Sequence, residues 1–166
     1  MAAAQQCANT LEIDPHHPDS LWCLGATYRE LGRPQEAMAA LKKLEETGGG
    51  IALVYGSLGH GYAIAGNIVE AERMLRAVQE AGRRNYYSPI CEAWIYANLP
   101  GHESSALDCI EQAYAERDFL IRYIGLSPAL RPLHGHPRFQ ALVHKMGLDD
   151  CTTESMVKTL ALSPKP

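Results

Sequence analysis

Three histidines near the C-terminal end of the chain, His134, His136 and His144, have the side chains best suited to binding a metal. Imidazole nitrogen is a common zinc ligand, and a structural zinc site takes four ligands. No cysteine or carboxylate lies between these histidines to complete such a set. We therefore expect them to be solvated or to cap helices, and His16 and His17 to lie in a loop before a helix. The sequence predicts no metal and no other cofactor.

Two other segments resemble catalytic or phosphate-binding motifs but lack the neighbours that those motifs need. The glycine run 48–50 has no Gly-Lys-Ser/Thr after it and no strand before it, so it fits a linker better than a phosphate loop. Ser57 lies in Tyr-Gly-Ser-Leu-Gly, whereas a nucleophile elbow needs Gly-x-Ser-x-Gly at a strand-to-helix turn. The residue types supply no nucleophile, base and orienting group. The chain is therefore not expected to be an enzyme, and an enzyme with an unrecognised site is the competing class.

Composition and charge limit the partners of the chain. Its 166 residues, 46% of them hydrophobic, suffice for one compact domain or a short solenoid. The net charge of −4 and the scatter of Arg and Lys give no basic stripe for nucleic acid. The sequence has neither an apolar run long enough to span a membrane nor a secretory signal at its start. Its five scattered cysteines suit reduced thiols, so we expect a cytoplasmic protein without membrane or direct nucleic-acid partners.

Part of the sequence repeats with a period of about 34 residues, the interval from Gly25 to Gly59. The first copy has Gly-Ala-Thr-Tyr from Gly25, Leu-Gly from Leu31, Glu-Ala from Glu36, and Leu41. The second copy has Gly-His-Gly-Tyr from Gly59, Ala-Gly from Ala65, Glu-Ala from Glu70, and Leu75. This period and this order of residues resemble the tetratricopeptide (TPR) repeat, in which each unit is a helix–turn–helix.

Each copy predicts two helices. Gly32 and Gly66 are expected to end the first helix of their copies, and Pro34 and Asn67 to begin the second. The expected packing residues are Leu21, Leu24, Tyr28, Leu31, Ala37, Leu41 and Leu44 in the first copy, and Tyr55, Leu58, Tyr62, Ala65, Ile68, Ala71, Leu75 and Val78 in the second. Small residues are expected where the helices approach closely: Gly25, Ala37, Gly59 and Ala71, but not Gly61.

The rest of the chain extends this plan less regularly. Tyr96 follows Tyr62 at the same interval, whereas the interval from Ala71 to Ala106 is longer by one, which places one inserted residue beside Pro100 and Gly101. We expect a truncated TPR represented by its second helix over 1–17, repeats over 18–51 and 52–85, a degenerate repeat over 86–118, a helical cap over 119–148 and a flexible tail over 149–166. The start in mid-repeat suggests a longer parent protein. The apolar residues expected to form the cap are Phe119, Leu120, Tyr123, Leu130, Leu133, Phe139, Leu142 and Met146.

Five further motifs support a narrower resemblance. They are Leu11-Glu12-Ile13-Asp14-Pro15, Tyr87-Ser88-Pro89, Ile95-Tyr96-Ala97, Ala113-Tyr114-Ala115-Glu116-Arg117, and His136-Pro137-Arg138-Phe139 through Met146-Gly147-Leu148. With them the chain resembles the C-terminal TPR region of bacterial regulators that carry a cyclase, winged-helix or serine/threonine kinase domain. Such regions usually have Asp in place of His136 and often Trp near Phe119. The resemblance implies a regulatory or scaffolding module.

The TPR resemblance also implies a binding groove lined by the first helix of each pair. The side chains that project to it are Trp22, Arg29, Glu30, His60, Tyr87, Trp94 and Asn98. Exposed aromatic residues beside Arg are typical of binding hot spots. The alternative is that Trp22 packs on the preceding half-repeat and Trp94 on the C-terminal segment.

These observations predict an all-α protein, a right-handed TPR superhelix of antiparallel helix pairs with a C-terminal helical cap. The expected function is binding of a protein or peptide, and an upstream catalytic or DNA-binding domain of the same parent chain is one candidate partner. A stand-alone cytosolic adaptor is the alternative within the same class.

Overall fold

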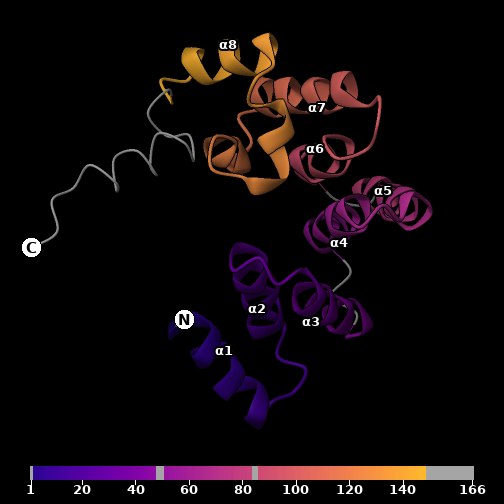
Figure 1. Ribbon diagram of the computed structural model, residues 1–166, viewed down its shortest axis with the longest axis vertical. Helices are drawn as coiled ribbons and strands as arrows, with labels where there is room; N and C mark the ends of the chain where they lie inside the picture. The colour runs from indigo at the N-terminus through magenta and orange to yellow at the C-terminus, as the bar shows by residue number, and fades with distance from the viewer. Residues whose placement is uncertain (1, 48–50, 84–85, 149–166) are drawn as a thin grey trace, which may run out of the picture. The chain divides into compact units, whose positions relative to one another are not determined.

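The computed structural model describes residues 2–47, 51–83 and 86–148, which contain helices and connecting turns but no strand (Figure 1). This confirms the all-α class. Two compact units make up the chain, with the boundary between Tyr87 and Ser88, and each is described by itself. The glycine run 48–50 and the expected tail 149–166 lie outside the described residues.

The first unit is a succession of helices in which each packs on the next along the chain. The helices are α1 (Ala2–Ile13), α2 (Pro18–Glu30), α3 (Pro34–Glu46), α4 (Ala52–Ile64) and α5 (Ile68–Gly82). The turns α2–α3 and α4–α5 are only three residues long, so the chain must reverse and lay each second helix against the first. The two helix pairs α2/α3 and α4/α5 therefore form helical hairpins.

The turns of these hairpins have the same backbone geometry. Gly32 and Gly66 have φ of 68° and 74°, a left-handed conformation that glycine adopts without steric cost. In each turn the residue after glycine donates its N–H to the carbonyl five positions earlier, the bond that closes a Schellman motif. These bonds are Arg33 N–H to Tyr28 C=O (2.8 Å) and Asn67 N–H to Tyr62 C=O (2.9 Å). The predicted helix ends at Gly32 and Gly66 are confirmed.

The second helix of each hairpin begins with the expected residue. Pro34 is the first residue of α3, where the N–H that proline lacks would have no partner within the helix. Asn67 precedes α5, and its side-chain oxygen accepts the backbone N–H of Glu70 at 3.3 Å. Asn67 is therefore the N-cap that the sequence predicts.

Small residues allow the helices of the first unit to approach one another. A Cβ added to Gly25 would lie 2.7 Å from Cγ of Leu41, which places the backbone of α2 directly against α3. Ala37 and Ala71 are buried, as expected. The expectation for Gly61 is wrong, because a Cβ on Gly61 would overlap the sulfur of Met38. Gly61 lies on the side of α4 that meets α3, a contact that the spacing within one hairpin did not reveal.

Three residues expected in the packing stripes are instead exposed. Leu31 is 43% exposed, and Ala65 and Ile68 are also exposed. Each stands at a turn, Leu31 and Ala65 just beyond a helix end and Ile68 at a helix start, where the chain leaves the hairpin interface. Met74 fills the interior of the second hairpin and is fully buried. The apolar stripe therefore ends with the helix and does not continue into the turn.

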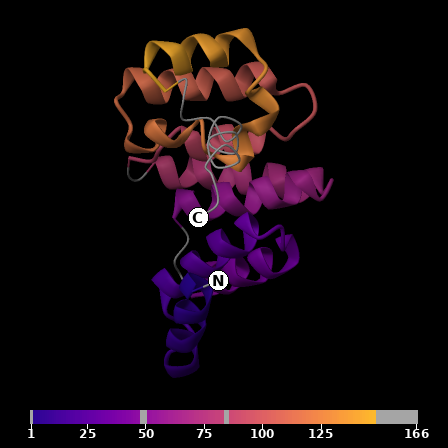
Figure 2. The same ribbon diagram turned by 60° about the vertical axis from the view of Figure 1, so that its left-hand side comes forward.

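The second unit contains one helical hairpin and three shorter pieces that pack on it. Its elements are α6 (Ile90–Tyr96), α7 (Glu103–Ala115), the 3-10 helices η1 (Phe119–Tyr123) and η2 (Pro128–Leu133), and α8 (Pro137–Lys145). α6 packs on α7 and η2, and α7 also contacts η1 and α8. Figures 1 and 2 both show α8 lying alongside α7.

The α6–α7 hairpin differs from the other two in its turn. α6 ends at Tyr96, whereas α4 continues for two residues beyond Tyr62. The chain then takes six residues to reach α7, with Gly101 at φ of 78°. The interval from the start of α5 to the start of α7 is one residue longer than the interval from the start of α3 to the start of α5. The inserted residue therefore lies before α7, in the turn region where the sequence predicts it. The ring of Tyr96 stacks on His102 across the turn, with centroids 5.6 Å apart.

Asp118 joins the beginning and the end of this hairpin. Its carboxylate accepts the hydroxyl of Ser88 at 2.7 Å and the backbone N–H of Leu120 at 2.8 Å. Ser88 in turn accepts the N–H of Ile90, the first residue of α6, at 3.2 Å. Asp118 is 4% exposed. One buried carboxylate therefore links the start of α6 to the start of η1.

The segment after α7 covers the hairpin with fewer aromatic side chains than expected. Leu130, Leu133, Phe139 and Leu142 are buried, as predicted, and Met146 is half-buried. The predictions for Phe119 and Tyr123 are wrong, because these residues are 56% and 51% exposed. η1 has about three residues per turn, so its side chains do not follow the 3.6-residue stripe, and Ile124 is buried in their place.

α8 is fixed by its cap and by one arginine. His136 precedes Pro137, and its Nδ1 accepts the backbone N–H of Arg138 at 3.2 Å. The guanidinium of Arg138 reaches across to α7 and binds Glu111 (2.9 Å) and Asp108 (2.7 Å). These two carboxylates raise the pKa of Arg138. Because the cluster is open to solvent, salt will screen it.

Arg117, at the end of α7, is a non-glycine residue in the left-handed conformation. It has φ of 56°, and the N–H of Asp118 binds the carbonyl of Ala113 at 2.9 Å, so Arg117 occupies the position that Gly32 has in its turn. An L-residue pays about 1–2 kcal/mol in this conformation. Arg117→Gly should raise the free energy of unfolding by about 1 kcal/mol, after the greater freedom of glycine in the unfolded chain is subtracted. Urea denaturation measures the difference.

Gly147→Ala, at φ of 67°, is the matched control and should destabilise by about 1 kcal/mol. A destabilised Arg117→Gly would contradict this description of the α7 end.

Asp118→Ala should lower the free energy of unfolding by about 2–3 kcal/mol. The substitution removes a buried carboxylate that accepts two hydrogen bonds, so the hydroxyl of Ser88 and the N–H of Leu120 lose this acceptor. Ser88→Ala should cost about 1 kcal/mol. Since the two side chains share one bond, the double variant should cost less than the sum of the single variants. Additive losses in urea denaturation would show that the link between Ser88 and Asp118 contributes nothing to stability.

Candidate functional site

The residues predicted to line a groove have different environments in the structure. Trp22 lies on α2 and is half-buried. His60 on α4 and Trp94 on α6 are only 2% and 8% exposed. The solvent exposure that we expected for His60 and Trp94 is therefore not observed. Arg29 and Glu30 are the last two residues of α2, and their side chains lie outside the described part of the structure.

The burial of His60 follows from the character of α4. Five consecutive residues, Gly56 to His60, are buried, and at 3.6 residues per turn they cover the full circumference of the helix. A helix that is apolar on all sides lies in a protein interior. The prediction that His60 lines a groove assumed that one face of α4 is exposed to solvent. From Gly56 to His60, α4 has no exposed face.

The other two predicted residues contribute to the fold. Tyr87 is half-buried, and its ring lies against Gly82, where no Cβ could fit. The amide nitrogen of Asn98 donates to the carbonyl of Trp94 (2.9 Å) and to that of Ala129 on η2 (2.8 Å). Asn98 thus ties α6 to η2, and its amide N–H groups are engaged within the unit.

Among the described residues, the buried indole nitrogen of Trp94 and the buried hydroxyl oxygen of Ser57 lack a hydrogen-bond partner. An unmet buried donor costs about 1–3 kcal/mol. They belong to different units, so they do not define one described site. The aromatic body of Trp94 is packed, as the alternative interpretation of this residue had it.

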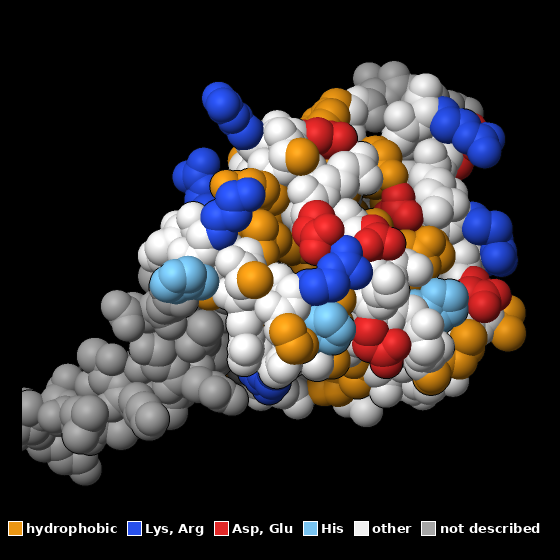
Figure 3. Space-filling view, turned by 90° about the horizontal axis from the view of Figure 1, so that it is seen from above, with side chains coloured by type: hydrophobic (Ala, Val, Ile, Leu, Met, Phe, Trp, Pro, Cys, Tyr) orange, Lys and Arg blue, Asp and Glu red, His pale blue; other side chains and the backbone are white. Residues whose placement is uncertain are grey.

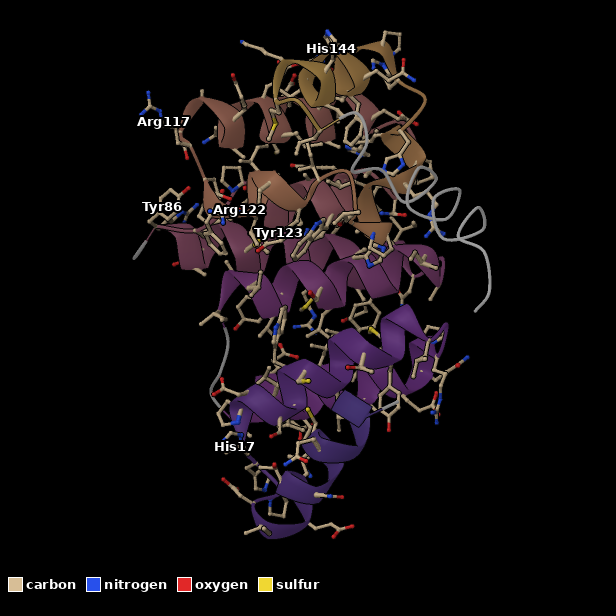
Figure 4. All side chains as sticks on the ribbon, turned by 90° about the vertical axis from the view of Figure 1, so that its left-hand side faces the viewer. His17, Tyr86, Arg117, Arg122, Tyr123 and His144 are labelled. Atoms are coloured by element: carbon tan, nitrogen blue, oxygen red, sulfur yellow. The ribbon has the colours of Figure 1, made fainter. Side chains whose placement is uncertain are left out.

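The exposed aromatic residues of the second unit gather on η1 and the turn after it. We call Phe119, Arg122, Tyr123 and Leu126 the η1 surface. Phe119 is 56%, Tyr123 51% and Leu126 38% exposed. Figure 4 shows Arg122 and Tyr123 next to each other on this segment, with Arg117 at the turn that precedes it. The η1 surface combines large apolar side chains with a cation.

Contacts within the η1 surface hold its arginine in place. The Nε of Arg122 donates to the carbonyl of Phe119 at 3.1 Å. The guanidinium carbon of Arg122 lies 5.9 Å from the centre of the Tyr123 ring, within the range of a cation–π interaction. The side chain of Arg122 is exposed, so a ligand in solvent can reach it. This arrangement can bind a carboxylate beside an apolar side chain.

Sequence reasoning assigned Phe119 and Tyr123 to the interior, because an apolar residue in a helical segment is usually buried. The prolines at 128 and 132 interrupt the helical pattern only in η2, so the sequence of η1 itself carries no comparable signal of its 3-10 geometry. In a 3-10 helix the residues three apart align, and this places Phe119 and Arg122 on the same side.

The charges of the second unit are mixed in sign. Figure 3 shows acidic, basic and apolar side chains interspersed on the face seen from above. The basic side chain of Arg138 is paired with Asp108 and Glu111, so it adds no positive surface. Within the η1 surface, by contrast, the only charged side chain is that of Arg122.

The histidines of the described residues act mainly as structural groups. His136 caps α8, and Nδ1 of His17 accepts the backbone N–H of Ser20 at 3.3 Å at the start of α2. The ring of His134 stacks on Phe139 with centroids 5.2 Å apart. The interpretation of His136 as a capping residue is confirmed. The described residues contain no group of three or more metal-binding side chains.

Two cysteines of the second unit have strongly perturbed thiols. Burial, reinforced by the nearby carboxylates of Asp118 and Glu92, raises the pKa of Cys91 to about 12. Burial, with Glu92 and Asp108, raises the pKa of Cys109 to about 12. The thiolate is the nucleophilic form of cysteine, so these thiols are unreactive near neutral pH.

Comparison of the chain with family models, with curated proteins and with solved structures finds no match. In the described part of the chain, no helix is both long enough and apolar enough to cross a membrane. The functional assignment therefore depends on the residues and geometry given above.

The exposure of the η1 surface predicts how its residues affect stability. The double variant Phe119→Ser/Tyr123→Ser should change the free energy of unfolding by less than about 1 kcal/mol, since substitutions of exposed residues usually have small effects. Leu130→Ala, a fully buried control in the same unit, should cost about 3 kcal/mol. Thermal denaturation followed by circular dichroism compares them. A loss in the double variant equal to that of Leu130→Ala would mean that Phe119 and Tyr123 are core residues.

Proposed function

We propose that this chain is a TPR-type array of helical hairpins that binds a protein or peptide. The observation that carries the proposal is the repetition of structure at the interval of the sequence repeat. Both helices of the α2/α3 hairpin begin again in the α4/α5 hairpin at the interval that separates Gly25 from Gly59. A unit of about 34 residues with two helices and a short turn is the TPR pattern.

Hydrogen bonds support this register in detail. The bond from Leu31 N–H to Thr27 C=O recurs at the same interval as the bond from Ala65 to Gly61. The bond from Ala37 N–H to Arg33 C=O recurs likewise, from Ala71 to Asn67. These backbone hydrogen bonds therefore recur at equivalent positions of the two turns. Stacked repeats of this kind bind partners on extended surfaces.

The η1 surface is the best-defined place for such a partner in the second unit. Interface hot spots are rich in aromatic residues and arginine, and these types are the ones exposed here. An exposed cation beside Phe119 and Tyr123 favours a peptide segment that carries both acidic and apolar side chains. In the first unit, the aromatic residues of the groove predicted from the sequence are Trp22 and Tyr87, and both are half-buried.

This binding module would serve as the regulatory or scaffolding part of a larger bacterial signalling or transcription regulator, as the motif through Leu148 suggests. Under the proposal the partner is another protein, or a catalytic or DNA-binding domain of the same parent chain.

Site-specific photo-crosslinking in cells tests the proposal. A benzophenone amino acid in place of Tyr123 should crosslink to one protein, whereas the same group in place of Gln140, an exposed residue of α8, should not. A third position, Trp22, reports on the predicted groove. The crosslinked segment of the partner, prepared as a peptide, should bind the purified chain, and Arg122→Glu should weaken that binding at least about tenfold.

Two results would overturn the assignment. Equal crosslinking from positions 123 and 140 would show that contact at Tyr123 is not selective. Unchanged affinity of Arg122→Glu for the recovered peptide would exclude the η1 surface, and if crosslinking then occurs only from position 22, the groove is the binding site instead.

A further inference from the structure

The last helix of the second unit ends close to the place where η1 begins. At the start of α8, Arg138 binds Asp108 and Glu111 in the middle of α7. At the other end of α8, Nζ of Lys145 lies 4.8 Å from the centre of the Tyr114 ring, in the last turn of α7. Only three residues separate α7 from η1. The chain therefore leaves α8 at the end of α7 that leads into η1.

The cations at this end of α7 are open to a ligand. Arg117 and Arg122 are both exposed, and among the described residues no ion pair holds either of them. Of the two acidic residues between α7 and η1, Asp118 is buried. The other, Glu116, accepts the side-chain amide of Gln112 at 2.8 Å. A carboxylate from elsewhere can therefore bind Arg117 or Arg122.

The residues that follow α8 have the side chains that the η1 surface favours. We call residues 149–166 the acidic-apolar segment. Its acidic residues are Asp149, Asp150 and Glu154, and its large apolar residues are Met156, Val157, Leu160 and Leu162. Carboxylates complement the guanidinium of Arg122, and aliphatic side chains can cover exposed aromatic rings.

The acidic-apolar segment is long enough to reach the η1 surface from Leu148. Fully extended, residues 149–166 span at most about 60 Å. The whole of α7 is only about 20 Å long. Because the segment belongs to the same chain, it meets the surface at an effective concentration of about a millimolar. An affinity too weak to join separate molecules would therefore still fill the surface.

We propose that the acidic-apolar segment binds the η1 surface of its own chain. Its carboxylates pair with Arg122 and Arg117, and its aliphatic side chains cover Phe119, Tyr123 and Leu126. The inference rests on the proposed function, because it makes the segment a competitor of the partner at the same surface. A partner binds only the fraction of molecules in which the surface is free, so its apparent affinity falls by that fraction.

Photo-crosslinking in the purified full chain, without any partner, tests which residues occupy the surface. A benzophenone amino acid in place of Tyr123 should crosslink within one molecule to tryptic peptide 146–158 or 159–166. The matched control replaces Glu103, an exposed residue at the opposite end of α7 that the segment is also long enough to reach. Glu103 should give no crosslink to these peptides. A crosslink between two copies of the chain, seen as a doubled mass on a denaturing gel, would show that a second copy is the occupant.

A fluorescent peptide of residues 149–162, with serine in place of Cys151, measures competition by fluorescence anisotropy. The full chain with Asp149→Lys/Asp150→Lys/Glu154→Lys should bind this probe at least about tenfold more tightly than the wild type, because its own segment no longer fills the surface. Adding Arg122→Glu to that variant should abolish the binding. The matched control Thr152→Ala/Thr153→Ala/Ser155→Ala keeps the acidic residues and should bind the probe as weakly as the wild type does.

The inference is overturned by a lack of crosslinks from Tyr123 to residues 146–166, by equal yields from Tyr123 and Glu103, or by equal affinity of the wild type and the lysine variant for the probe. These results would leave the proposed function standing if Tyr123 still crosslinks to another protein in cells. Conversely, an internal crosslink in the purified chain without any partner crosslink in cells would count against the proposed function alone.

Discussion

The left-handed residue at the end of a helix is the constraint on which both units of this protein depend. After α2, α4, α7 and α8 the chain places one residue at positive φ, and the next residue donates its N–H to the carbonyl five positions back. The bond satisfies carbonyl groups that the helix end leaves open, and it turns the chain away from the helix axis. At these four helix ends the residues at positive φ are Gly32, Gly66, Arg117 and Gly147, and Gly101 in the turn after α6 is also at positive φ.

Once the direction of reversal is fixed, a narrow set of side chains must fill the space between the helices. The backbone of α2 comes so close to α3 at Gly25 that no side chain fits, and Leu41 occupies the space. Gly61 has the same relation to Met38 across the next pair of helices. Close packing of this kind makes the volume at each position matter, since protein interiors have little free space to absorb an added methyl group.

The second unit shows what happens when the repeat is interrupted. The longer turn after α6, the prolines of η2 and the charged cap at Asp118 replace a further hairpin by short pieces. Short pieces bury fewer side chains than a two-turn helix, and the aromatic rings of Phe119 and Tyr123 stay in solvent. Clustered apolar surface that stays exposed often marks a place where a partner binds. The same interruption that ends the regular repeat therefore produces the η1 surface on which the proposed function rests.

Sequence patterns alone predicted the all-α class, the helix ends at Gly32 and Gly66, the cap at Asn67 and most of the buried residues. Those features follow from local rules, namely backbone conformation at glycine, side-chain capping and apolar periodicity, and each needs only a few neighbouring residues. Tertiary structure decided the rest. Whether His60 or Trp94 faces a ligand depends on what packs around α4 and α6, and whether Phe119 is buried depends on the 3-10 geometry of η1.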